Sequence, residues 1–136
     1  MRVAIVGYGS AGRFFHAPLI AATDGLVVSS IVTSNATRAG QAAVEHPEAE
    51  VVSSLQALWA ATPPEIVVVA TSNDSHVPIA STAIEHGVPV VVEKPAGVTA
   101  TETQALAEQA DRADVMLTVF QNRRWDTDQL TLRRVI

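Results

Sequence analysis

The sequence G-Y-G-S-A-G at positions 7–12 follows an apolar run at positions 1–6. This G-x-G-x-x-G spacing, after an expected strand and before an expected helix, is typical of a loop that binds the pyrophosphate of a dinucleotide. The first glycine permits the turn, the second lets the backbone approach phosphate, and the third lets the helix pack on the strand. Free N–H groups at the start of the helix suit an anion. A tight turn without a ligand is the alternative. The residues expected to bind the dinucleotide here are Gly7, Gly9, Ser10, Ala11 and Gly12.

The end of the second apolar run, residues 27–32, bears on which dinucleotide is bound. An NAD-specific domain usually has an acidic residue about 20 residues after the glycines, which accepts hydrogen bonds from the ribose hydroxyls. Here Thr33, Ser34 and Asn35 occupy that region. A 2′-phosphate would accept hydrogen bonds from the hydroxyls of Thr33 and Ser34 and from the guanidinium of Arg38. The sequence therefore favours NADP and leaves NAD open, and the alternative for Arg38 is a solvent-exposed helix residue.

Lys94 is the only lysine of the chain, and it follows an apolar run between Glu93 and Pro95. We expect its ammonium group to lie near the nicotinamide and to hydrogen-bond the reacting oxygen of a substrate. There it would stabilise charge or relay a proton, which makes Lys94 the candidate catalytic residue. We expect Glu93 and Lys94 to contact the cofactor as well. The alternative is an exposed residue at a strand end with a neighbouring salt bridge.

Two further polar segments follow the apolar runs at residues 66–70 and 115–120. The first offers hydroxyl, amide and backbone donors beside the pyrophosphate or the nicotinamide ribose, although a polar loop with Asn73 or Ser75 as helix N-cap explains it equally well. In the second, the tryptophan either packs in the core or lies against the nicotinamide. The candidate cofactor-binding residues of the two segments are Thr71, Ser72, Asn73, His76, Asn122 and Trp125.

No metal site is expected. The chain has four dispersed histidines without a recognisable ligand spacing and no cysteine. We interpret His16 and His46 as surface or packing residues.

Apolar β-branched runs alternate with helical stretches along the whole chain, which predicts an α/β fold with a parallel sheet buried on both faces. We expect six strands, at residues 1–6, 27–32, 51–52, 66–70, 90–93 and 115–120, in the Rossmann order 3-2-1-4-5-6. The first helix is expected to end or kink near Ala17 because Pro18 lacks a backbone donor. Ligands bind at the carboxyl ends of such strands, so the candidate residues are expected to meet at one edge of the sheet.

Composition limits the classes of function. A length of 136 residues predicts one domain, and a net charge of −5 argues against a general nucleic-acid surface. The apolar runs are far shorter than the roughly 20 residues of a membrane span, and no secretory signal precedes the first strand. The absence of cysteine agrees with a reducing compartment. We therefore expect a soluble, cytoplasmic protein without nucleic-acid or membrane partners.

Taken together, the segments at residues 7–12, 15–18, 70–76, 93–95 and 122–126 resemble the Gfo/Idh/MocA family of NAD(P)-dependent oxidoreductases. The H-A-P and R-R-W-D versions look most like the branch that contains NADP-dependent scyllo-inositol dehydrogenases. The resemblance implies hydride transfer between nicotinamide and a hydroxyl or keto group of a sugar or cyclitol. It also implies that Lys94 contacts cofactor and substrate, and that Asn122 and Trp125 approach the nicotinamide.

Family members continue into a second α/β domain that supplies the substrate pocket and usually the oligomer interface. We therefore expect residues 1–122 to form the NAD(P)-binding domain and residues 123–136 to begin the interdomain helix, with the C-terminal domain absent. On this interpretation the chain alone binds nucleotide without full catalysis, and a homo-oligomer remains open. The alternative is a stand-alone nucleotide-binding or redox-sensing module that acts through a partner.

Overall fold

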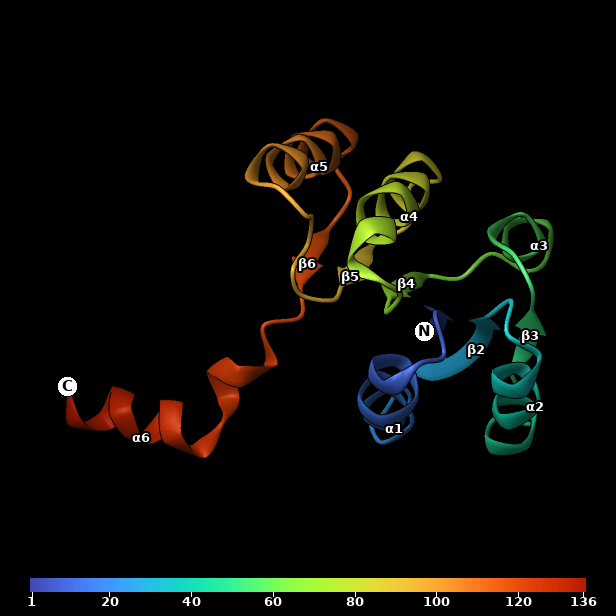
Figure 1. Cartoon of the computed structure of the whole chain (residues 1–136), viewed down its shortest axis with the longest axis horizontal. Coiled ribbons are helices and arrows are strands. Elements are labelled where there is room, and N and C mark those ends of the chain that lie inside the picture. Colours follow the sequence, from blue (N-terminus) through green and yellow to red (C-terminus); the bar gives the residue numbers. More distant parts are fainter.

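The computed structural model describes residues 1–136 and contains one six-stranded parallel sheet in the order β3-β2-β1-β4-β5-β6 (Figure 1). This order confirms the predicted Rossmann topology. The strands are β1 (Arg2–Val6), β2 (Val27–Val32), β3 (Glu50–Val52), β4 (Ile66–Val69), β5 (Val90–Val92) and β6 (Leu117–Val119). The helices are η1 (Gly12–His16), α1 (Ala17–Ala21), α2 (Ala36–Glu45), α3 (Leu55–Ala60), α4 (Asn73–Glu85), α5 (Ala100–Ala113), η2 (Asn122–Trp125) and α6 (Thr127–Val135).

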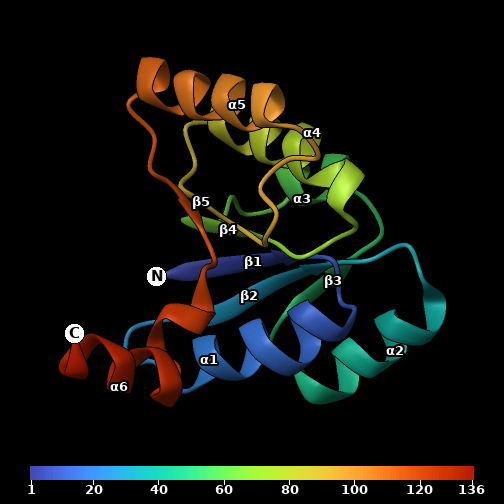
Figure 2. The ribbon, with the colours of Figure 1, turned by 60° about the vertical axis from the view of Figure 1, so that its left-hand side comes forward.

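The helices form two layers around the sheet. Helices α1 and α2 lie on one face and α3, α4 and α5 on the other, as both Figure 1 and Figure 2 show. Helix α6 projects away from the sheet and buries no residue. The longest helix, α5, has 14 residues, and no helix is long and apolar enough to span a bilayer.

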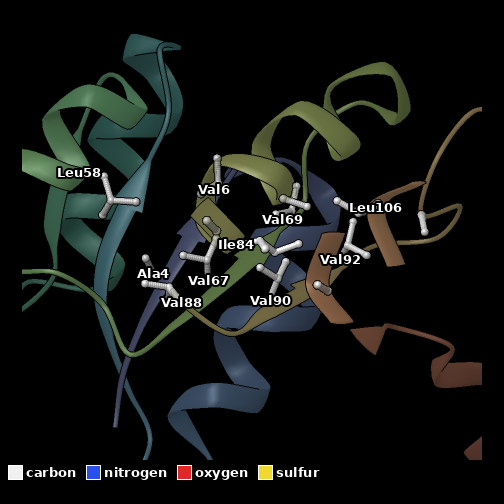
Figure 3. Packing of buried hydrophobic residues seen from close by; sticks show 14 of the residues in the cluster. Ala4, Val6, Leu58, Val67, Val69, Ile84, Val88, Val90, Val92 and Leu106 are labelled. Carbon is white, nitrogen blue, oxygen red and sulfur yellow. The ribbon is translucent and has the colours of Figure 1, made fainter. Parts of the chain in front are cut away.

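The core explains why the central strands read as unbroken apolar runs. Side chains alternate between the two faces of a strand, so Ala4 and Val6 of β1 point to one face while Val3 and Ile5 point to the other. Figure 3 shows the cluster that includes Ala4 and Val6, in which β4 and β5 pack beneath Ile84 of α4 and Leu106 of α5. Both faces of β1 and β4 are therefore buried, as a parallel sheet requires.

Helix ends follow the local chemistry of their sequences. The Asn35 side chain accepts a hydrogen bond from the Arg38 amide (3.0 Å), and Ser54 caps α3 in the same way. Thr99 and Glu102 form a capping box at the start of α5. Gly87 follows α4 with φ of 70°, as expected of a residue that terminates a helix. The N-caps thus fix where α2, α3 and α5 begin at the carboxyl edge of the sheet, and Gly87 ends α4 at the opposite edge, before β5.

The two expectations about helix ends have different outcomes: the first helix is irregular just before Ala17, where an end or kink was expected, whereas the alternative N-caps for α4 are wrong. Pro18 does not end the first helix: the chain stays helical from Ser10 to Ala21, and the turn before the proline is of the wide π type. In that turn the Ala17 amide donates to the Gly12 carbonyl. A wider turn relieves the crowding between a proline ring and the carbonyl four residues earlier. Helix α4 begins at Asn73 with Ser72 as N-cap, so neither Asn73 nor Ser75 is the cap.

Candidate functional site

The glycine loop presents a run of free backbone donors. The amide of Gly7 donates to Val32 of the neighbouring strand (2.9 Å) and the amide of Arg13 donates to Gly9 (2.9 Å). Between them, the amides of residues 8–12 donate to no protein acceptor. The last three of these, at residues 10–12, begin the helix. Free amides at a helix N-terminus attract an anion, so this loop has the chemistry of a phosphate cradle.

Two of the glycines are needed for close packing. Gly7 has φ of +98°, and a Cβ atom there would lie 2.5 Å from the carbonyl oxygen of Ala70. A Cβ atom on Gly12 would collide with the carbonyl oxygen of Gly7. Gly9 is different, because a Cβ atom there would meet only the guanidinium of Arg38, at 3.7 Å from Nη1. The first and third glycines therefore hold the loop against the sheet, while the second leaves its outer side open.

A cleft of about 620 Å³ lies above this loop, and we call it the glycine-loop cleft. Its walls come from the ends of β1, β2, β3 and β4, which confirms that the polar segments after these strands meet at one edge of the sheet. The cleft contains nine of the predicted cofactor-binding residues: Gly7, Gly9, Ser10, Ala11, Thr33, Ser34, Arg38, Thr71 and Ser72.

Arg38 is the one cation that lines the glycine-loop cleft. Its side chain is exposed and makes no hydrogen bond or ion pair with the protein, whereas its backbone amide is held by the Asn35 cap. No carboxylate lines this cleft, and Thr33 stands where an NAD-specific domain would have one. An unpaired guanidinium in a cleft that two hydroxyl groups also line supplies the hydrogen-bond donors that a phosphate accepts from.

A second cleft of about 490 Å³ adjoins the first and shares Ser10 and Ala11 with it. We call it the lysine cleft, because Lys94 lines it together with the predicted residues Glu93 and Asn122. Lys94 is exposed, and its ammonium group makes no hydrogen bond or ion pair. The neighbouring salt bridge that would have given it a purely structural role is absent, so the ammonium is free to bind an oxygen of a ligand.

Glu93 forms part of the wall of the lysine cleft and is largely buried there. One carboxylate oxygen lies 3.1 Å from Nε2 of His16, and the other accepts the backbone amide of Lys94 at 3.0 Å. His16 is only 4% exposed, and its ring packs on Phe120 with centroids 4.4 Å apart. Burial lowers the pKa of His16, and the hydrogen bond with Glu93 opposes this shift only in part.

His76 is buried beneath the same edge of the sheet and lines none of the clefts. Its Nδ1 lies 2.8 Å from the carbonyl oxygen of Pro95, and its Nε2 lies 3.2 Å from that of Thr71. Both ring nitrogens thus face backbone carbonyl oxygens, and a neutral ring donates a hydrogen bond to one of the two. In this geometry His76 connects the loop after β4 to the segment that carries Lys94, and it has no free nitrogen for a cofactor.

Tyr8 anchors the glycine loop to the end of α2. Its hydroxyl donates to Oε2 of Glu45 at 2.7 Å, and Arg13 forms an ion pair with the same carboxylate. Burial, and then the hydrogen bond to Glu45, raises the pKa of Tyr8, while the hydrogen bond from Arg13 lowers the pKa of Glu45. Because α2 also carries Arg38, this contact fixes the cation relative to the loop.

Besides Gly12 and the buried His76, two further predicted residues, Asn73 and Trp125, line neither cleft. Asn73 lines a separate hollow with Ser72 and Pro95. Trp125 is 68% exposed and lines a groove of about 400 Å³ with Leu19 and Phe120, which shares Asn122 with the lysine cleft. In this arrangement neither side chain contacts the glycine-loop cleft or the lysine cleft.

Comparison with known proteins agrees with the fold and the glycine loop. The family model described as "Oxidoreductase family, NAD-binding Rossmann fold" matches residues 1–121. The chain belongs to the Gfo/Idh/MocA oxidoreductase family. Over 136 residues it is 40% identical to the uncharacterized oxidoreductase YdgJ of Escherichia coli strain K12, covering 100% of this chain and 38% of that protein. It is 38% identical to the scyllo-inositol 2-dehydrogenase (NADP(+)) IolW of Bacillus subtilis strain 168, covering 100% of this chain and 37% of that protein.

Solved structures of oxidoreductases share the same architecture. The Bacillus subtilis protein described as "putative oxidoreductase yvaA" superposes with a TM-score of 0.92 at 37% identity, over 99% of this chain and 39% of that one. The chain therefore spans less than two fifths of the length of these family relatives.

Some of the residues that line the two clefts were not predicted from the sequence. Ser53 lines the glycine-loop cleft directly after β3, so the rule that ligands meet strand ends would have identified it. Phe15 and Asp126 line the lysine cleft. His16 was interpreted as a surface or packing residue: the structure shows it buried, but paired with Glu93. No local signal in the sequence indicates that pairing, because the partners are 77 residues apart.

Proposed function

We propose that this chain forms the NADP(H)-binding part of an oxidoreductase that transfers a hydride between nicotinamide and a hydroxyl or keto group of a sugar or cyclitol. The observation that carries the proposal is the unpaired guanidinium of Arg38 at the glycine-loop cleft, in a strand-end region that lacks a carboxylate. The binding part comprises residues 1–122, which agrees with the family match over residues 1–121 and with the projection of α6.

The residues present fit such a cofactor. The free amides of residues 10–12 would bind the pyrophosphate, and a side chain on Gly9 would narrow the open side of that loop. Thr33, Ser34 and Arg38 would hydrogen-bond the 2′-phosphate. Thr71 and Ser72 offer donors on the opposite wall of the same cleft. When bound, the nicotinamide supplies the hydride acceptor or donor of the reaction.

At the adjoining cleft, Lys94 and Asn122 are placed to receive the reacting end of the substrate. The Lys94 ammonium would donate a hydrogen bond to the substrate oxygen, which stabilises negative charge as it develops there. The ammonium can give a proton to that oxygen, and the neutral amine form of the same side chain can accept one from it.

The assignment of substrate class rests on the relatives. IolW is named as an NADP-dependent scyllo-inositol 2-dehydrogenase and is 38% identical to this chain. An oxidoreductase role is also favoured over a redox-sensing module because YdgJ, the first relative described above, is named as an oxidoreductase too. A cyclitol or sugar presents the ring hydroxyl that a free ammonium group would contact.

A pair of adenine nucleotides tests the cofactor assignment on the chain itself. We expect adenosine 2′,5′-bisphosphate to compete with NADPH for the chain at least about tenfold more strongly than AMP, since one charge-assisted contact is worth roughly 1.5–3 kcal/mol. NADPH should likewise bind more tightly than NADH in a fluorescence titration. Equal affinities for NADPH and NADH, or a preference for NADH, would contradict the proposal.

A further inference from the structure

Three segments distant in the sequence form the lysine cleft. Ser10, Ala11 and Phe15 come from the start of the first helix, Glu93 and Lys94 follow β5, and the remaining residues follow β6. Nothing in the backbone hydrogen bonding of the sheet joins the first helix to the ends of β5 and β6. The relative position of these walls therefore depends on side chains.

His16 is the residue at which the three segments meet. It belongs to the π turn that also carries Phe15, its Nε2 lies 3.1 Å from Glu93 Oε1, and its ring packs on Phe120. The amide of Phe120 donates to Val92 (2.8 Å), so the chain leaves β6 beside the end of β5 before its next residues line the cleft. A carboxylate oxygen only accepts, so His16 Nε2 carries the hydrogen of this contact.

The Glu93 carboxylate links His16 to the backbone of Lys94. The backbone amide of Glu93 is fixed to the sheet through Val69 (2.9 Å), and its second carboxylate oxygen accepts the amide of Lys94 at 3.0 Å. The carboxylate thus has one oxygen on His16 and one on the backbone of the candidate catalytic residue. A buried carboxylate that loses one such partner relaxes toward another donor or toward water, because an unpaired buried charge is costly.

We propose that His16 and Glu93 are positioning residues that hold Lys94 in the lysine cleft for contact with the reacting oxygen. This inference rests on the proposed function, since it is the hydride-transfer site that Lys94 serves. The π turn agrees with the assignment, because such turns are frequent at functional sites. In this chain the turn places His16 inward, toward Glu93, and leaves Phe15 at the cleft.

Lys94 offers a direct measurement of this contact. It is the only lysine, so [¹⁵N]lysine labelling of the whole chain gives one backbone amide signal, from the very amide that donates to Glu93. Its chemical shift and its hydrogen-exchange rate report on that hydrogen bond without any cofactor. Addition of NADPH then shows whether the same signal responds to ligand in the adjoining cleft.

Four variants separate positioning from packing. His16→Leu keeps the volume of the side chain and removes the donor, His16→Gln restores an N–H donor, and Glu93→Gln keeps the shape and removes the charge. His86→Leu is the matched control, because His86 is exposed and stacks on Trp59, away from both clefts.

In His16→Leu we expect the Lys94 amide signal to shift and to exchange about tenfold faster, which corresponds to the loss of one hydrogen bond. The shift that NADPH induces should be lost, while the Kd for NADPH changes by less than about threefold because its phosphate contacts lie elsewhere. His16→Gln should restore the wild-type signal, Glu93→Gln should shift it, and His86→Leu should leave it unchanged.

An unchanged Lys94 amide in folded His16→Leu overturns the proposal, and so does a His16→Gln variant that behaves like His16→Leu. If His16→Leu does not fold, the Glu93→Gln variant decides instead: an unshifted Lys94 amide signal refutes the link from His16 through Glu93 to Lys94. If NADPH does not bind the wild-type chain, the proposed function is wrong, but the amide measurements still establish or refute the link from His16 through Glu93 to Lys94.

Discussion

Replacing Arg38 by alanine tests whether this side chain distinguishes NADPH from NADH. The substitution is structurally clean, because the cap of α2 uses the Arg38 backbone amide and not its side chain. Alanine also favours a helix. The guanidinium has no partner in the protein to leave unpaired. Any effect on binding therefore belongs to the contact with the ligand.

The expected magnitude follows from the place of the side chain. A hydrogen bond between a guanidinium and a phosphate contributes roughly 1.5–3 kcal/mol, and the exposure of Arg38 places it near the lower value. We therefore expect Arg38→Ala to raise the Kd of NADPH about tenfold and to leave that of NADH nearly unchanged. Salt should shrink the difference, since charges are screened over about 10 Å at 0.1 M ionic strength.

Fluorescence titrations with NADPH and NADH measure both effects. Arg112→Ala is the matched control because it removes the same charge from an exposed position near the end of α5, where Arg112 lies 3.8 Å from Glu108. If Arg38→Ala raised the Kd of NADPH and of NADH equally, Arg38 would be acting on the part of the dinucleotide that the two share, or on the fold. If Arg112→Ala raised the Kd of NADPH as much as Arg38→Ala does, the effect would come from the net charge of the protein and not from the position of Arg38.

Three further predictions concern the loop, the buried histidine and the lysine. Gly12→Ala should abolish NADPH binding because its Cβ would collide with Gly7, whereas Gly40→Ala, with nothing within 4 Å of the new Cβ, should stabilise α2 by roughly 0.5–1 kcal/mol; titration and thermal unfolding compare the two. Because the pKa of His16 is lower in the folded chain, the unfolded chain binds a proton on this histidine first as the pH falls; the contribution of neutral His16 to the free energy of unfolding is therefore complete above about pH 6.5 and is lost toward the folded pKa. Between pH 7 and 5.5 the free energy of unfolding should decrease more steeply with falling pH in the wild type than in His16→Gln. Equal slopes in the two proteins would exclude His16 as the source. In a longer protein of the family that contains this chain, Lys94→Ala should lower turnover far more than cofactor affinity, and normal turnover would remove Lys94 from the reaction.

The sheet and its ligand-binding edge could be predicted from the sequence because they depend on local periodicity. Unbroken apolar runs identified β4 and β5 as buried parallel strands, and the topology rules then fixed their order. Once the order is set, the residue after each strand must lie at the carboxyl edge. Thr33, Thr71 and Glu93 were located in this way.

The division of that edge into two clefts could not be predicted, since it depends on side-chain directions. Trp125 follows β6 by only a few residues, yet it faces Leu19 and not the lysine cleft. His76 lies between Thr71 and Pro95 and points inward to their carbonyl oxygens. Proximity along the chain to a strand end places a residue at the edge, but tertiary packing decides which side of the edge its side chain faces.

Arg13 and Arg38 show why residue type alone does not assign a binding role. Both lie near the N-terminal end of a helix that follows a central strand, where the helix dipole stabilises a bound anion. Arg13 is bound by Glu45, which is 32 residues away and also holds Tyr8, so its charge is already compensated. Arg38 has no such partner and faces the cleft. The same distinction separates Glu93, whose two oxygens are occupied, from Lys94, whose ammonium is free. The side chains available to a ligand are those that the fold leaves unpaired, and the paired ones hold them in place.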